Sequence, residues 1–63
     1  MTNYQIAKST LKTISYDAKQ MHRDDKPMIR AIINDSADSI SKDLNLNEYK
    51  RDLLSNYACK LHP

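Results

Sequence analysis

The chain has 63 residues, of which 40% are hydrophobic, and ten basic and eight acidic side chains leave a formal net charge of only +2. This composition, with its clear hydrophobic periodicity, excludes wholesale disorder. Because the positive and negative charges nearly balance, the net charge gives no argument for nucleic-acid binding. The chain contains no glycine and no long alternation of apolar and polar residues. Tight hairpins and a β-sheet are therefore disfavoured, and the expected fold class is all-α.

The first predicted helix spans about residues 2–23. Apolar side chains recur here at alternating spacings of three and four residues, which keeps them on one narrow seam of a helix. The members of this seam are Tyr4, Ala7, Leu11, Ile14, Ala18 and Met21. Thr2 and Gln5 have the spacing of a capping box, and positive charge near Arg23 suits the negative end of the helix dipole.

The second predicted helix spans about residues 27–43. Pro27 suits the first helical position, and the aspartates just before it favour a helix N-terminus. The expected core face consists of Ile29, Ile33, Ala37, Ile40 and Leu44. Met28 and Ile32 fall outside this face, so the helix is apolar over a wider arc than one neighbour covers. These two residues are therefore candidates for a second contact surface.

The third predicted helix spans about residues 46–61, although one continuous helix from Pro27 to Leu61 is the alternative. Asn45 is the expected N-cap, with Glu48 at the third helical position, and asparagine also tolerates the left-handed backbone at a helix end. The residues expected to face inward are Leu46, Tyr49, Leu53, Tyr57 and Leu61. Leu54 and Ala58 are expected on a flank.

These elements predict a single domain over residues 1–63, built as an antiparallel helical hairpin plus a third helix. A core this small usually needs a disulfide, a metal ion or self-association to stabilise it. Cys59 is the only cysteine, so an intramolecular disulfide is excluded. His22 and His62 have no cysteine neighbours at metal-ligand spacing. No metal or cofactor is therefore expected, and a homodimeric helical bundle is favoured over a lean monomer. The candidate partner-binding residues are Tyr16, Met28, Ile32 and Leu54.

A basic stripe on the first helix supports a different function. Its members are Lys8, Lys12, Lys19 and Arg23. They could contact the phosphates of a nucleic acid, or they could form a solvated flank whose stems cover a small core. The second and third helices could also form a helix-turn-helix DNA-binding unit. Glu48 and Asp52 oppose that interpretation because they would repel phosphates.

Enzymatic chemistry has little support, because the chain shows no glycine-rich phosphate loop, metal-ligand cluster or nucleophile elbow. No segment has the apolar length of a signal peptide or a membrane span, so a cytoplasmic protein without membrane contact is expected. A lone cysteine also fits a reducing compartment. The expected role is a non-enzymatic one, exercised through binding.

The whole chain, from MTNYQIAKSTLK through DAKQMHRDDKPMIRAIINDSADSI to YKRDLLSNYACKLHP, resembles the short accessory proteins encoded between the exonuclease and excisionase genes of lambda-like temperate bacteriophages. The resemblance lies in length, opening residues and the absence of glycine. It implies an early regulatory protein in the host bacterial cytoplasm. Such a protein would bind a host or phage protein, favour lytic development and perturb the host cell cycle or replication. No site residues carry over from this resemblance.

Overall fold

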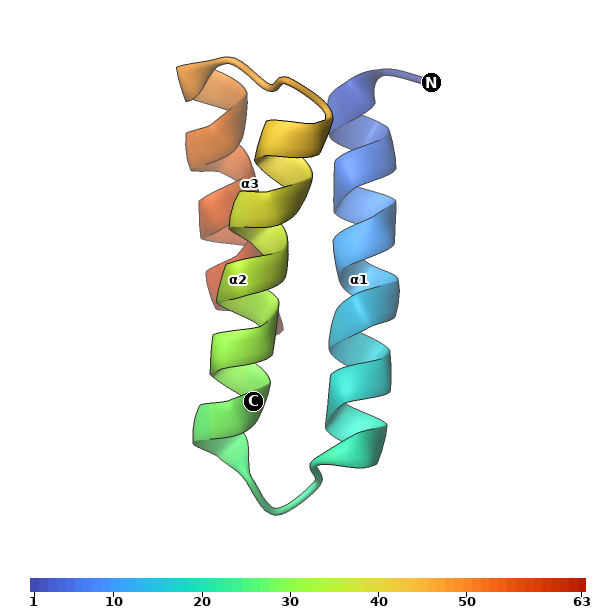
Figure 1. Cartoon of the computed structure of the whole chain (residues 1–63), viewed down its shortest axis with the longest axis vertical. Coiled ribbons are helices and arrows are strands. Elements are labelled where there is room, and N and C mark those ends of the chain that lie inside the picture. Colours follow the sequence, from blue (N-terminus) through green and yellow to red (C-terminus); the bar gives the residue numbers. More distant parts are fainter.

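The computed structural model describes all residues from 1 to 63 and contains three helices and no strand, which confirms the all-α prediction. The helices are α1 (Asn3–Met21), α2 (Lys26–Asp43) and α3 (Glu48–Leu61). In Figure 1, α1 and α2 run side by side in opposite directions, and α3 lies behind α2. The α2–α3 connection brings the chain back alongside α1, so each helix packs against both others.

Side-chain caps start all three helices. Thr2 and Gln5 form the predicted capping box, in which the Gln5 N–H donates to Thr2 Oγ1 at 3.2 Å and the Thr2 N–H donates to Gln5 Oε1 at 2.9 Å. At the start of α2 the Met28 N–H donates to Asp25 Oδ1 at 3.1 Å. Because Lys26 is already helical, Pro27 takes the second helical position rather than the first.

The corner between α2 and α3 corrects one prediction. Asn45 has a φ of 54° and ends α2, as the Leu46 N–H donates to the Ser41 carbonyl at 3.0 Å and the Asn45 N–H to the Lys42 carbonyl at 3.2 Å. An N-cap needs extended backbone, so Asn45 does not cap α3. Asn47 does so instead, accepting from the Lys50 N–H at 2.8 Å.

The core is small and runs along the axis between the helices. Its eight buried apolar residues are Ala7, Leu11, Ala18, Ile29, Ile33, Ala37, Leu54 and Ala58. Ser15 and Ser41 are also buried, and their hydroxyls donate to the Lys12 and Ala37 carbonyls of their own helices, each at 2.8 Å. The predicted faces of the first two helices supply six of the eight core residues, which leaves α3 as the element whose orientation differs.

Two expectations about the core are wrong. Met21 is 76% exposed because it ends α1, where the chain turns before α2 begins at Lys26. On α3, Leu54 and Ala58 are buried at the centre, whereas Tyr49 is exposed. The physical reason is that α3 packs against α1 and α2 together. Its buried face is therefore rotated from the single seam that the periodicity predicted.

Candidate interaction surfaces

The contact between α1 and α3 is lined by tyrosine rings and lysine ammonium groups. Lys8 Nζ of α1 lies 4.9 Å from the ring centroid of Tyr57 on α3. Lys50 Nζ of α3 lies 5.1 Å from the ring centroid of Tyr4 on α1 and 5.8 Å from that of Tyr49. These distances are within the range of cation–π attraction. Both helices thus present cations and aromatic rings on the same side of the molecule.

Three members of the predicted basic stripe extend this surface along α1. At about 100° per residue, Lys8, Lys12 and Lys19 fall within an arc of about 40° on α1, and Tyr16 lies about 40° from Lys12. Tyr16 is 64% exposed. Arg23 does not belong to the stripe, because it follows the end of α1, where its guanidinium donates to Gln20 Oε1 at 3.3 Å.

We call this surface the lysine–tyrosine face. Helix α1 contributes Tyr4, Lys8, Lys12, Tyr16 and Lys19. Helix α3 contributes Tyr49, Lys50, Tyr57 and Lys60, the last of which lies one turn beyond Tyr57. The only acid within α1 is Asp17, about 180° around the helix from Lys8. The face therefore collects cations that no carboxylate of α1 neutralises.

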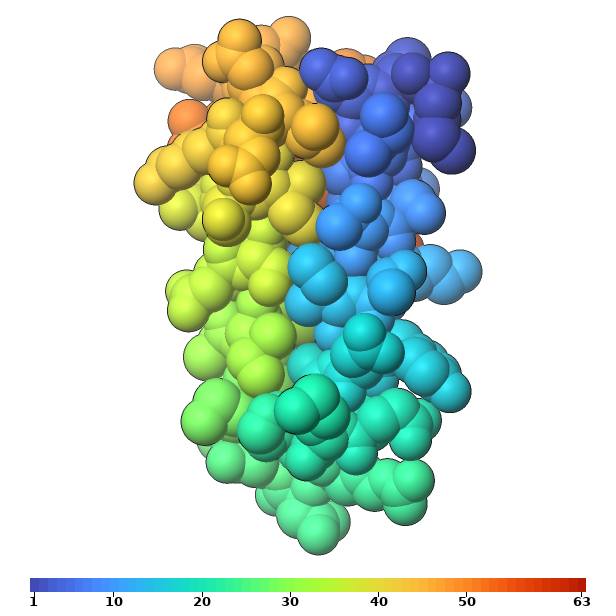
Figure 2. Space-filling model, turned by 45° about the vertical axis from the view of Figure 1, so that its right-hand side comes forward, coloured from blue at the N-terminus to red at the C-terminus, as the bar shows by residue number.

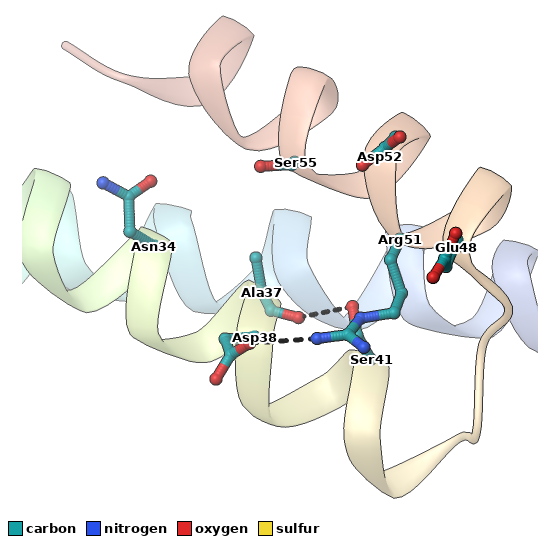
Figure 3. A pocket seen from close by; sticks show the side chains of 8 residues that line it. All are labelled: Asn34, Ala37, Asp38, Ser41, Glu48, Arg51, Asp52 and Ser55. Atoms are coloured by element: carbon teal, nitrogen blue, oxygen red, sulfur yellow. Dashed lines mark hydrogen bonds and ion pairs between the residues drawn. The ribbon is translucent and has the colours of Figure 1, made fainter.

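The acids of α3 lie on its other side, in a polar groove shared with α2. This groove has a volume of about 370 Å³ and is shown in Figure 3. It is lined by Asn34, Ala37, Asp38, Ser41, Glu48, Arg51, Asp52 and Ser55. Arg51 reaches across the groove to Asp38 with an N–O distance of 3.6 Å, and Lys42 pairs with the same carboxylate at 3.1 Å. Both pairs are exposed, so they contribute little to stability.

A third surface lies where α1 and α2 meet on the side away from α3. Figure 2 shows these two helices side by side, with α3 behind them. Lys8 marks the side of α1 that faces α3, because its ammonium group lies over Tyr57 of α3. Ile14 and Met21 lie about 120° and 140° around α1 from Lys8. On α2, Ile32 lies about 180° from Ser41 of the polar groove, and Met28 is one turn away.

We call Ile14, Met21, Met28 and Ile32 the α1/α2 seam. Ile14 and Ile32 are half-buried, whereas Met28 is 44% exposed and Met21 is more exposed still. The seam is thus an apolar strip that the third helix does not cover. Sequence reasoning found Met28 and Ile32 from the apolar width of their helix, but it placed Ile14 and Met21 within the core.

The four predicted partner-binding residues do not form one patch. Tyr16 belongs to the lysine–tyrosine face, and Met28 and Ile32 belong to the α1/α2 seam. Leu54 has no exposed surface, so it cannot contact a partner without unfolding of α3. Its expected place on a flank is wrong because α3 turns this side chain into the space between α1 and α2.

The residues with chemical reactivity are dispersed. Cys59 is an exposed free thiol. His62 Nε2 lies 3.0 Å from Asn34 Oδ1, which links the end of α3 to the middle of α2. No group of three or more His, Cys, Asp or Glu side chains is placed to hold a metal ion. None of the helices combines the length and apolar character that crossing a membrane requires.

The geometry defines a class of protein, a small all-α bundle of three helices with charged and apolar surfaces on different sides. No family model matches the chain, and no curated protein or solved structure matches it either. The surfaces of the molecule are therefore the guide to its function.

Proposed function

We propose that the chain is a non-enzymatic binding protein that forms a homodimer through the α1/α2 seam and acts on a partner protein. The observation that carries the proposal is the seam itself, four apolar side chains on a face that α3 leaves open. Contiguous exposed apolar surface is typical of protein contact sites. The antiparallel hairpin of α1 and α2 is then the dimerising unit, and α3 covers its opposite side.

A second copy of the chain is the occupant that best fits the seam. Half of the eight core residues are alanines, so the core supplies little apolar area for a chain that must fold with about 60 residues. Two copies related by a twofold axis would place seam against seam, and one interface would cover the apolar strips of both. Self-association therefore serves the stability of the chain as well as its function.

Sedimentation at micromolar concentration tests the dimer. The expected species has twice the monomer mass of 7.3 kDa. Met21→Glu combined with Met28→Glu should shift the chain to monomer, because both side chains are exposed and belong to the seam. Tyr16→Glu combined with Tyr49→Glu is the matched control, since these side chains are comparably exposed on another face. A wild-type monomer, or equal loss of dimer in both variants, contradicts the proposal.

The role in the cell rests on the resemblance to phage accessory proteins. We propose an early regulatory protein that binds a host protein of replication or the cell cycle and so favours lytic development. Expression in the host bacterium should change cellular DNA content, measured by flow cytometry. The double Met21→Glu and Met28→Glu variant should have no such effect at equal protein level. Unchanged DNA content with the wild-type chain would remove this role.

A further inference from the structure

The lysine–tyrosine face combines positive charge with aromatic rings. Its five lysines are Lys8, Lys12, Lys19, Lys50 and Lys60, and it also holds all four tyrosines of the chain. The carboxylates of α3 that could neutralise these lysines, Glu48 and Asp52, line the groove on the other side. The fold therefore concentrates positive charge and aromatic rings on one surface of a chain that is almost neutral overall.

From this arrangement we infer that the lysine–tyrosine face binds single-stranded nucleic acid, an activity separate from the proposed dimer contact. Ammonium groups neutralise backbone phosphates and release counterions, whereas exposed rings stack on unpaired bases of any sequence. Tyr16 is the ring best placed for stacking, because most of its surface is exposed between Lys12 and Lys19. In a duplex the bases are already stacked on each other, so they offer no free face on which such a ring could stack.

The dimensions of the face fit a short length of strand. Tyr4 and Lys19 are fifteen residues apart on α1, which corresponds to about 22 Å along the helix axis. The contacts of Lys8 with Tyr57 and of Lys50 with Tyr4 hold α3 beside the first half of this track. A strand following α1 would meet Lys50 and Lys8 near one end, then Lys12 and Tyr16, and Lys19 at the other end.

Fluorescence anisotropy with a labelled oligothymidylate of about ten nucleotides tests this inference. If all five lysines neutralise phosphates, the logarithm of the affinity should fall with the logarithm of salt with a slope of about −3.5, so that raising salt from about 50 to 200 mM weakens binding roughly a hundredfold. Absence of binding at low salt overturns the inference. Tighter binding of a duplex of the same length also overturns it.

Two matched double variants distinguish binding at the lysine–tyrosine face from general attraction between a cationic protein and a polyanion. Lys12→Gln with Lys19→Gln removes two charges from the face and should reduce the salt slope by about 1.4. Arg30→Gln with Lys42→Gln removes the same charge from exposed positions on α2 and should leave the slope unchanged. Equal weakening in both variants overturns the inference, since any two cations would then serve. Circular dichroism of each variant verifies that the helices remain folded.

The tyrosine contribution has its own test. Tyr16→Ala should weaken oligothymidylate binding by between about fivefold and a hundredfold while leaving the salt slope unchanged, because stacking involves no counterion. An unchanged affinity overturns the single-strand assignment. Vesicles rich in phosphatidylserine are the competing polyanion. Binding to these vesicles without binding to the oligonucleotide would assign the face to a lipid surface and overturn the inference.

Discussion

The orientation of α3 makes a sharp prediction, because it decides which of two adjacent leucines supports the fold. Leu54 is fully buried, whereas its neighbour Leu53 is half-buried and lies outside the core cluster. Replacing a buried leucine with alanine costs about 2 to 5 kcal/mol, since transfer energy is lost and a cavity is left. Replacing a half-buried one costs about 1 kcal/mol.

These magnitudes are large for a chain of this size, whose core supplies only about 3 to 5 kcal/mol. Leu54→Ala should therefore lower the midpoint of thermal unfolding by at least about 8 °C, or leave the chain partly unfolded at room temperature. Leu53→Ala should fold and melt a few degrees below the wild type. The measurement is far-ultraviolet circular dichroism against temperature at one fixed protein concentration. Equal destabilisation by the two changes, or a larger loss with Leu53→Ala, would refute the orientation of α3.

The remaining stability predictions concern the corner between α2 and α3. Asn47→Ala should lower the free energy of unfolding by about 1 kcal/mol, because it removes the side chain that accepts from the Lys50 N–H. Urea titration measures this loss, and an unchanged midpoint would show that the cap does not contribute. Asn45→Val should cost roughly 1 to 2 kcal/mol because a β-branched side chain disfavours the positive φ, whereas Asn45→Gly should stay within about 0.5 kcal/mol of the wild type. Equal tolerance of valine and glycine in thermal melts would contradict this account.

Much of the fold could be predicted from the local pattern, because the core faces of α1 and α2 follow unambiguous helical spacing. The orientation of α3 could not. Four of its apolar residues occur as the adjacent pairs Leu53–Leu54 and Tyr57–Ala58, so a helical seam can be drawn through either member of each pair. Which member is buried depends on how α3 packs against two helices at once. This depends on the tertiary structure and is not contained in the local pattern of the sequence. The same dependence on packing applies to Lys50, which is half-buried and whose ammonium group lies 5.1 Å from the ring centroid of Tyr4 on α1.

The candidate surfaces, like the fold, could be predicted from the sequence only in part. The spacing of Lys8, Lys12 and Lys19 was enough to predict that they share one side of a helix. The contribution of α3 was not predictable, because the meeting of Lys8 with Tyr57 depends on the register of two helices that are distant in sequence. The net charge of +2 was uninformative for a related reason. It adds the charges of the lysine–tyrosine face to those of the polar groove, which the fold places on different sides of the molecule.

The two proposed surfaces lie on different sides of α1, which leads to a further prediction. A dimer formed through the α1/α2 seams leaves both lysine–tyrosine faces uncovered, so a strand long enough to reach both would bind them together. Such linked binding increases affinity by roughly a hundredfold or more when the geometry allows simultaneous contact. Wild-type protein should therefore prefer a thirty-nucleotide strand over a ten-nucleotide strand by far more than the threefold gain in available sites.

The double variant Met21→Glu with Met28→Glu tests this coupling. As a monomer it should retain most of its affinity for the ten-nucleotide strand, since both changes lie outside the lysine–tyrosine face, but it should lose the additional preference for the long strand. Anisotropy titrations of both strands with both proteins, at the same salt, give the four affinities needed. An equal length preference in the dimer and the monomer would show that the two faces do not act together. A large loss on the short strand as well would place the seam methionines within the nucleic-acid contact instead.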